Sequence, residues 1–236
     1  MIGWYVVGIL AISLLIVVQQ GGHYLVARAC GLRVNRVRIG FGPVLLRVAP
    51  RDGGLWLTVL GKLTRRLGAH DAARHGPTVL ELALVPVTGY TEIAGLSPFE
   101  EIDPHDRGSY ANAGPAARAL TVASGPLANY LLAVVLFFAA FLGGGRAVEE
   151  RRVPVGVGEA LLLAVQAPPR VVAELIAGAL DARAPGREFG GIGKRLAGEA
   201  QGAWPERLHL LATLSACFGA ANLVSLLLAR RAKRPP

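Results

Sequence analysis

The chain has 236 residues, of which 53% are hydrophobic and only 17% are charged. Soluble domains carry about 25% charged residues, so this composition favours a membrane protein. The formal net charge is +9, but several basic residues flank apolar runs and are not interleaved with aromatic residues. We therefore expect membrane lipids, and no nucleic acid, to be the partner of these charges. The two cysteines, Cys30 and Cys217, form no CxxC motif, which excludes a disulfide framework and a metal knuckle.

Three segments are apolar over about the 20 residues that a bilayer crossing requires. We predict membrane-spanning helices at residues 2–29, 119–142 and 208–229. No cation precedes Arg28, whereas several arginines follow it. The positive-inside rule therefore predicts an N-terminus outside the cell and a cytoplasmic region after the first helix. The basic sequence RRAKRPP, which begins at Arg230, predicts a cytoplasmic C-terminus by the same rule.

Residues 30–118, between the first two predicted spans, are rich in strand-forming residues. VNRVRIGFGPVLLRV and PTVLELALVPVTGYTEIAG each predict a strand, because Val, Ile and Leu alternate with Gly and Pro punctuation. The leucines and arginines of residues 55–76, which separate these two strands, predict a short amphipathic helix on the lipid headgroups. The polar sequence FEEIDPHDRGSY predicts a loop.

The region between the second and third spans, residues 143–207, contains a fourth apolar stretch at residues 156–180. This stretch carries several charges and the Pro168-Pro169 pair. We predict that it is an amphipathic interfacial segment that breaks at the two prolines, and not a fourth span.

Five segments of the chain, in this order, resemble the site-2 protease family of intramembrane zinc metalloproteases, whose bacterial members include the regulator of sigma-E protease. They are HYLVARACGLRVNRVRIGFGP, LALVPVTGYTEIAG, SGPLANYLLAVVLFF, GGIGKRLAGEA and LATLSACFGAANL. The resemblance covers much of the chain, apart from residues 51–75 and the stretch that begins after Gly143.

The resemblance implies an α-helical membrane fold in the bacterial inner membrane. We expect one domain over residues 1–236, with a three-helix transmembrane core of the site-2 protease type. A small membrane-associated β-hairpin or sheet, cytosolic or re-entrant, would occupy residues 30–118, and an amphipathic interfacial helix would accompany it. Relatives often carry a PDZ domain between the second and third spans, but residues 143–207 are too few for us to expect one there.

The family holds zinc with the two histidines of an HExxH helix and a later aspartate, and its glutamate is the general base. Aligned on HYLVAR, His23 takes the place of the second histidine, while Gln19 and Gln20 replace the first histidine and the glutamate. Aligned on LSACFGAANL, Asn222 matches the motif asparagine and Arg230 replaces the aspartate. An amide is a poor zinc ligand and cannot shuttle a proton, and an arginine repels a dication. The resemblance therefore implies a pseudoprotease with no intact catalytic set, in which His23 is the only surviving ligand-type residue.

Structural roles are open at the same positions. His23 is either a residual metal ligand or a polar residue that is hydrogen-bonded to Gln19 or Gln20 inside the helix bundle. The glycine pair that begins at Gly21 would let a neighbouring helix or strand approach closely. Arg230 either anchors the third span at the cytosolic interface or fills the vacated metal pocket.

The sequence VPVTGYTEIAG resembles the family strand to which substrate adds as a further edge strand, which implies that Gly89 and Tyr90 bind substrate. Strand addition uses backbone groups, so it can survive the loss of catalysis, and a plain structural hairpin is the alternative. GPLAN resembles the family GPxxN motif, in which Asn129 would reach substrate or the carbonyls that Pro126 frees, or would serve helix packing. Asn222 completes the implied substrate-binding set.

Our leading hypothesis is a pseudoprotease, without a cofactor, that binds a transmembrane or membrane-proximal segment of a single-span membrane protein. Such a partner could be an anti-sigma factor, and an active paralogue is a further candidate. The alternative is an active intramembrane protease that holds zinc with His23 and three loop histidines, His70, His75 and His105. A third hypothesis is a structural subunit of a membrane assembly.

Overall fold

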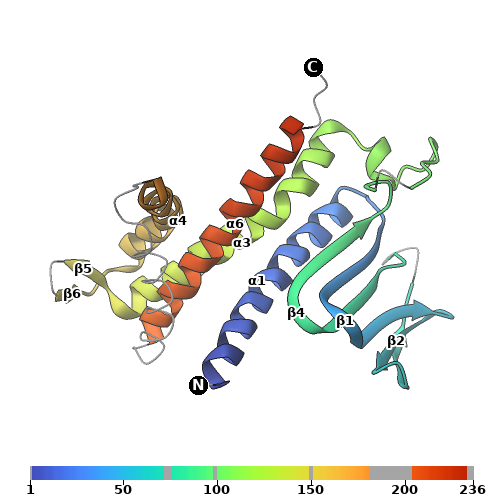
Figure 1. Cartoon of the computed structure of the whole chain (residues 1–236), viewed down its shortest axis with the longest axis horizontal. Helices are drawn as coiled ribbons and strands as arrows, with labels where there is room; N and C mark the ends of the chain where they lie inside the picture. Colours follow the sequence, from blue (N-terminus) through green and yellow to red (C-terminus); the bar gives the residue numbers. More distant parts are fainter. Residues whose placement is uncertain (1, 72–75, 98–99, 149–150, 181–203, 233–236) are drawn as a thin grey trace. The chain divides into compact units, whose positions relative to one another are not determined.

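The computed structural model describes residues 2–71, 76–97, 100–148, 151–180 and 204–232 of the chain (Figure 1). Its helices and strands are α1 (Ile2–Ala29), β1 (Val34–Arg51), β2 (Gly54–Val59), β3 (Leu63–Ala69), β4 (Val79–Ile93), the 3-10 turn η1 (Tyr110–Asn112), α3 (Pro115–Gly144), β5 (Arg146–Val148), β6 (Arg151–Val153), α4 (Val157–Leu180) and α6 (Trp204–Ala232). The chain divides into two compact units, Met1–Gly125 and Pro126–Pro236, and the boundary falls inside α3.

Within the described part of the chain, three helices are long and apolar enough to cross a membrane, as the sequence predicts. The candidate spans are Ile9–Ala29, Pro115–Gly144 and Arg207–Val224. Large apolar side chains stand exposed along them, among them Leu25 in α1 and Leu131 and Val135 in α3, each more than 60% exposed. A protein surrounded by water rarely exposes so many leucines and valines in one region, whereas lipid tails solvate them well.

The first unit contains a four-stranded sheet in the order β3-β2-β1-β4. β1 and β4 confirm the two strands that the sequence predicts. Both are long, and Ile39 of β1 pairs with Leu82 as well as with Gly89 of β4, so the two halves of β4 flank the first half of β1. The second half of β4, residues 89–93, pairs only with β1 among the described strands. It therefore forms an edge of the sheet.

The amphipathic helix predicted for residues 55–76 is wrong over residues 55–69, because these residues belong to the β2–β3 hairpin, and residues 72–75 lie outside the described part of the chain. The Asp-Gly pair at residues 52–53 has φ angles of 50° and 68°, and residues 60–61 have φ angles of 52° and 70°. Two successive residues with positive φ are the geometry of the tight turns that close β-hairpins. Leu55, Leu57 and Val59 alternate with other residues along β2, which is a strand period. The leucine spacing by itself is compatible with a helix or a strand, and the two turns with positive φ angles favour the hairpin.

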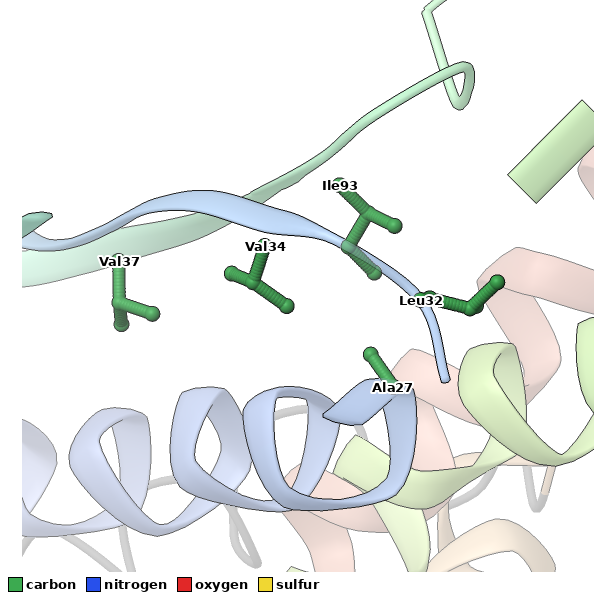
Figure 2. Close-up of a cluster of buried hydrophobic side chains, with 5 residues drawn as sticks. All are labelled: Ala27, Leu32, Val34, Val37 and Ile93. Atoms are coloured by element: carbon green, nitrogen blue, oxygen red, sulfur yellow. The ribbon is translucent and has the colours of Figure 1, made fainter. Parts of the chain in front are cut away.

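The core of the first unit joins the C-terminal end of α1 to the sheet. Figure 2 shows the side chains that meet there, which are Ala27, Leu32, Val34, Val37 and Ile93. Ala27 and Val34 are 0% exposed, and Leu32 is 1% exposed. Because Ala27 has a small side chain, the strands can lie close to the helix at this point.

β4 follows α1 along the helix axis (Figure 1). The Ser13 hydroxyl donates a hydrogen bond to the Pro86 carbonyl at 2.8 Å. Further along the helix, Nε2 of Gln20 donates to the Gly89 carbonyl at 3.1 Å. Ala27 then meets the end of the strand in the core. From Ser13 to Ala27 a helix rises about 21 Å. The strand therefore lies beside the candidate span and not beyond its end.

The second unit packs the later part of α3 against α4 and α6. Its core consists of four alanines and one phenylalanine, which are Ala133, Phe137, Ala164, Ala212 and Ala216. Small residues allow helices in a membrane to approach closely, which is the usual source of their association there. The Phe137 ring meets the edge of the His209 ring at a centroid distance of 4.9 Å. The two short strands β5 and β6 pair with each other.

The helix break predicted at Pro168 and Pro169 is wrong, because α4 runs without interruption through both prolines. Pro168 is fully buried, and Ala164, Ala167 and Val171 around it pack into the core of the second unit. Tertiary packing therefore holds this segment helical although two backbone donors are missing. The location of α4 at the membrane surface stays a prediction, and the sequence GGIGKRLAGEA lies outside the described residues.

The buried Leu32 offers a test of the first core. We expect Leu32→Ala to lower the free energy of unfolding by about 2–4 kcal/mol, because it leaves a cavity between α1 and the sheet. Leu25→Ala is the matched control, since Leu25 is 66% exposed. Thermal unfolding in detergent micelles measures both, and equal effects of the two changes would contradict this description of the core.

Candidate functional site

The structure distributes the predicted site residues over both units. The first unit holds Gln19, Gln20, His23, Gly89 and Tyr90. The second unit holds Asn129, Asn222 and Arg230. Within the first unit, the helix residues and the strand residues come together, because β4 runs beside α1.

His23 lies on α1 and is fixed by the first turns of α3. Its Nδ1 is 2.8 Å from the Thr121 carbonyl oxygen and 3.4 Å from the Ser124 hydroxyl. A carbonyl only accepts, so Nδ1 carries the proton and donates it to Thr121. A Cβ atom on Gly125 would stand only 2.2 Å from Nε2 of the ring. The backbone of α3 therefore holds the ring.

Gln20, at the position where the resemblance implies a general base, is turned towards β4. Its Nε2 donates to the Gly89 carbonyl at 3.1 Å, and its Oε1 accepts from the Thr91 hydroxyl at 2.8 Å. The residue is only 7% exposed. Both ends of the amide are thus used in one buried contact between helix and strand. Gln19, the next residue back, is half-buried on the same helix.

Gly89 permits this contact because it has no side chain. A Cβ atom there would lie 2.8 Å from Cγ2 of Ile16 and 3.1 Å from Cγ of Gln20. The close approach expected at the glycine pair is wrong for Gly21, since no neighbouring helix or strand comes within 4 Å of the point where its Cβ would stand, and for Gly22 it stays a prediction. The glycine that brings strand and helix together is on the strand.

A groove of about 550 Å³ runs beside the edge of the sheet. It is lined by four consecutive residues of β4, residues 90–93, and by Leu96, Ser97 and Glu100 from the turn that follows. Consecutive residues of one strand line it together because the groove follows the edge of the strand and not one face of the sheet. An extended peptide would fit such a groove by adding a strand.

The other face of the sheet carries the charge. The Glu81 carboxylate is 5% exposed and lies 3.6–4.0 Å from the guanidinium groups of Arg36, Arg38 and Arg47. Arg38 pairs directly with both Glu81 and Tyr90 in the sheet register, so these three side chains share a face. A hydrogen bond that the Arg36 guanidinium donates to the Tyr90 hydroxyl oxygen, and the charge of Glu81, raise the pKa of Arg36. Tyr90 is thereby tied to the arginine cluster at the edge of the groove.

Asn129 and Asn222 belong to the helix packing of the second unit. Asn129 is 0% exposed, and its backbone carbonyl accepts a 2.7 Å hydrogen bond from Ser215 of α6. Asn222 donates to the Phe218 carbonyl at 2.9 Å within its own helix. The burial of Asn129 favours the packing role over contact with substrate. Arg230 lies near the end of α6, and its side chain is outside the described part, so its role stays a prediction.

The residues in place do not fit a zinc ion. His23 keeps the orientation of a ligand histidine, whose second nitrogen typically bonds a carbonyl or carboxylate. However, zinc takes three or four protein ligands, and the amide of Gln20 is already committed at both ends. Within the described ranges, no three His, Cys, Asp or Glu side chains are grouped to hold a metal.

The loop histidines lie in other surroundings. His70 bonds the Gly76 carbonyl at 2.9 Å through Nε2, and His105 lies in the exposed loop before η1. His75 falls outside the described residues. Neither His70 nor His105 belongs to a group of three His, Cys, Asp or Glu side chains within the described ranges, so the described geometry does not support the ligand set of the alternative hypothesis.

Three residues of this site were not singled out from the sequence. Thr91 lies two positions after Gly89, so its hydroxyl reaches the same face of β4 and the same glutamine. Thr121 and Ser124 hold His23, and Ser124 directly precedes the Gly-Pro pair that begins with Gly125. Alternation along the strand could have identified Thr91. The contact of Thr121 is through its backbone, which leaves no trace in residue type.

The family described as Peptidase family M50 matches the chain over residues 7–227. A protein of Rhizobium meliloti, provisionally named a zinc metalloprotease, is 35% identical over 59% of this chain and 33% of its own length. Protease RseP of Yersinia pestis is 34% identical over 58% of this chain and 25% of its own length. The regulator of sigma E protease of Salmonella typhimurium is 31% identical over the same shares. The chain thus spans about a quarter to a third of the length of these curated relatives.

Gly125 tests how α3 holds His23. We expect Gly125→Ala to cost about 1–3 kcal/mol of stability, because the new Cβ would overlap the His23 ring and force the helices apart. Gly21→Ala is the control on α1 and should be neutral or stabilising by up to about 1 kcal/mol, since its Cβ meets open space and alanine favours a helix. Thermal unfolding of both variants provides the measurement. A Gly125→Ala protein as stable as the wild type would refute the close packing.

Proposed function

The chain belongs to peptidase family M50, and from this premise we propose that it is a catalytically inactive member, a pseudoprotease, which binds a transmembrane or membrane-proximal segment of a partner protein. The observation that carries the proposal is the amide of Gln20. It occupies the position of the general base and spends both its donor and its acceptor on β4.

Loss of catalysis follows from the chemistry of the side chains. Peptide hydrolysis in the family needs a group that takes a proton from water, and an amide has no accessible conjugate acid near neutral pH. The metal needs imidazole and carboxylate ligands, of which His23 alone remains in the matching positions. With neither a base nor a ligand set, we derive no cleavage step for this chain.

Binding does not require the missing groups. Strand addition uses backbone donors and acceptors, and residues 89–93 form a sheet edge with a groove of about 550 Å³ beside it. The strand runs beside Ser13 and Gln20 of the candidate span Ile9–Ala29. A segment that unwinds from a helix near the membrane surface could therefore reach this edge without leaving the protein–lipid boundary.

The partners we propose are membrane lipids and single-span membrane proteins, such as an anti-sigma factor, or an active paralogue of this chain. One relative is named Protease RseP and another is named a regulator of sigma E protease, and we take these names as support for this class of partner. Family membership and three apolar helices make this a membrane protein. We further propose that the protein lies in the bacterial inner membrane, with its N-terminus outside the cell and its C-terminus in the cytoplasm.

Metal content separates the pseudoprotease from the active alternative. After purification in the presence of zinc, we expect substoichiometric metal by plasma mass spectrometry, unchanged in His23→Ala. Stoichiometric zinc that disappears in His23→Ala would show that a working metal centre exists and would end the proposal. The comparison uses the full chain in detergent, so that the membrane helices stay intact.

Cross-linking tests the binding edge directly. A photo-reactive residue at position 90 should cross-link to a synthetic single-span anti-sigma segment in lipid nanodiscs, because Tyr90 lines the groove. The same residue at position 64, on the exposed strand β3, should not. Equal labelling from both positions would argue against the edge as the binding surface. Cleavage of the segment that stops with a chelator would establish the active protease in its place.

A further inference from the structure

We propose that Gln20 is a positioning residue that clamps the edge of β4 to α1 and sets where the binding groove begins. In this view the substitution that removes the general base also supplies a fixed strand for binding. The inference rests on the proposed function, which it deepens by assigning a new role to the vacated catalytic position.

The contact requires one side chain to donate and accept at adjacent points. Gly89 presents a carbonyl oxygen, which needs a donor, and Thr91 presents a hydroxyl, which donates to Oε1 at 2.8 Å. Gly89 and Thr91 are two residues apart, so they lie on the same face of the strand. A primary amide has both functions in one plane. Glutamine is long enough to reach both groups from the helix.

An ionised glutamate at position 20 could not make the same contact. The carboxylate is an acceptor only, so it would keep the bond from Thr91 but would face the Gly89 carbonyl oxygen without a proton between them. At 7% exposure, water cannot easily replace the lost bond. A glutamate would therefore have to bind a proton to make the contact that the amide makes at every pH.

The clamp also defines the end of the groove. The lining begins at Tyr90 and continues through Ile93, whereas Gly89 does not line it. Gly89 cannot offer its carbonyl to an incoming peptide on the side where Gln20 already bonds it. We infer that an added strand pairs with residues 90–93 and stops at the clamp.

A strand that is already fixed loses less conformational entropy when a peptide adds to it. The two hydrogen bonds of the Gln20 side-chain amide hold residues 89–91 against a helix that is itself rigid. The backbone groups of residues 90–93 therefore stay aligned. Loss of either hydrogen bond should therefore weaken peptide binding by loosening the edge, while the backbone groups that pair with the peptide stay the same.

The test compares Gln20→Glu, Gln20→Met and Thr91→Val with the wild-type chain in lipid nanodiscs. Gln20→Glu keeps the acceptor and removes the donor, Gln20→Met removes both, and Thr91→Val removes the second bond alone. Thr58→Val is the matched control, since Thr58 lies on β2 and its hydroxyl contacts only Thr64 at 3.4 Å among the contacts described. Thr91→Val also covers the case in which a Gln20 variant fails to fold.

The first readout is amide hydrogen exchange of residues 89–93 in the absence of any peptide. We expect the three clamp variants to exchange about five to ten times faster there, with exchange in β2 and β3 unchanged. Thr58→Val should match the wild type at residues 89–93. Equal exchange in all five proteins, or faster exchange throughout the sheet, would overturn the clamp as a local positioning device.

The second readout is the affinity of the same proteins for the synthetic single-span anti-sigma segment. We expect the clamp variants to bind about five to ten times more weakly than the wild type, and Gln20→Glu to gain no cleavage activity. Full affinity in the clamp variants would overturn the positioning role. No binding by any protein, with the exchange differences present, would instead overturn the proposed function while the clamp between α1 and β4 stands.

Discussion

The first unit depends on the contact in which β4 lies along α1. A helix satisfies its own backbone groups, but a strand edge beside a membrane span exposes carbonyls that need donors. α1 supplies them from side chains, since Ser13 bonds the Pro86 carbonyl and Gln20 bonds the Gly89 carbonyl. Apolar burial around Ala27 then closes the contact at the end of the helix. These two carbonyls therefore have hydrogen-bond donors, although the sheet lies beside an apolar helix.

Gln20 and His23 illustrate the same constraint. A polar side chain inside a helix bundle must find partners wherever it stands, and the partners within reach decide what it does. Gln20 is hydrogen-bonded to β4, and His23 is hydrogen-bonded to the backbone of α3. Each bond fastens α1 to a neighbouring element of the first unit.

Small residues allow close packing in both units, and charged residues gather on one face of the sheet in the first unit. Gly89 and Gly125 bring a strand and a helix close to α1, while alanines do the same for the helices of the second unit. On the outer face of the sheet, Glu81 is nearly buried among three arginines, where the pairing offsets the cost of removing its charge from water. The sheet therefore has one face for the helix and one that carries charge, with the groove along the edge between them.

The amino-acid sequence was sufficient to predict the three apolar helices and the two long strands, because length, hydropathy and residue pattern are local properties. The family motif also pointed to Gly89 and Tyr90, which lie in the edge strand β4, and their role in binding stays a prediction. The tertiary structure was needed to show that residues 54–69 form a hairpin, that α4 continues through Pro168, and that Gln20 bonds β4. Those outcomes depend on which groups meet across many residues, such as Gln20 and Gly89, and no local pattern records the geometry of that meeting.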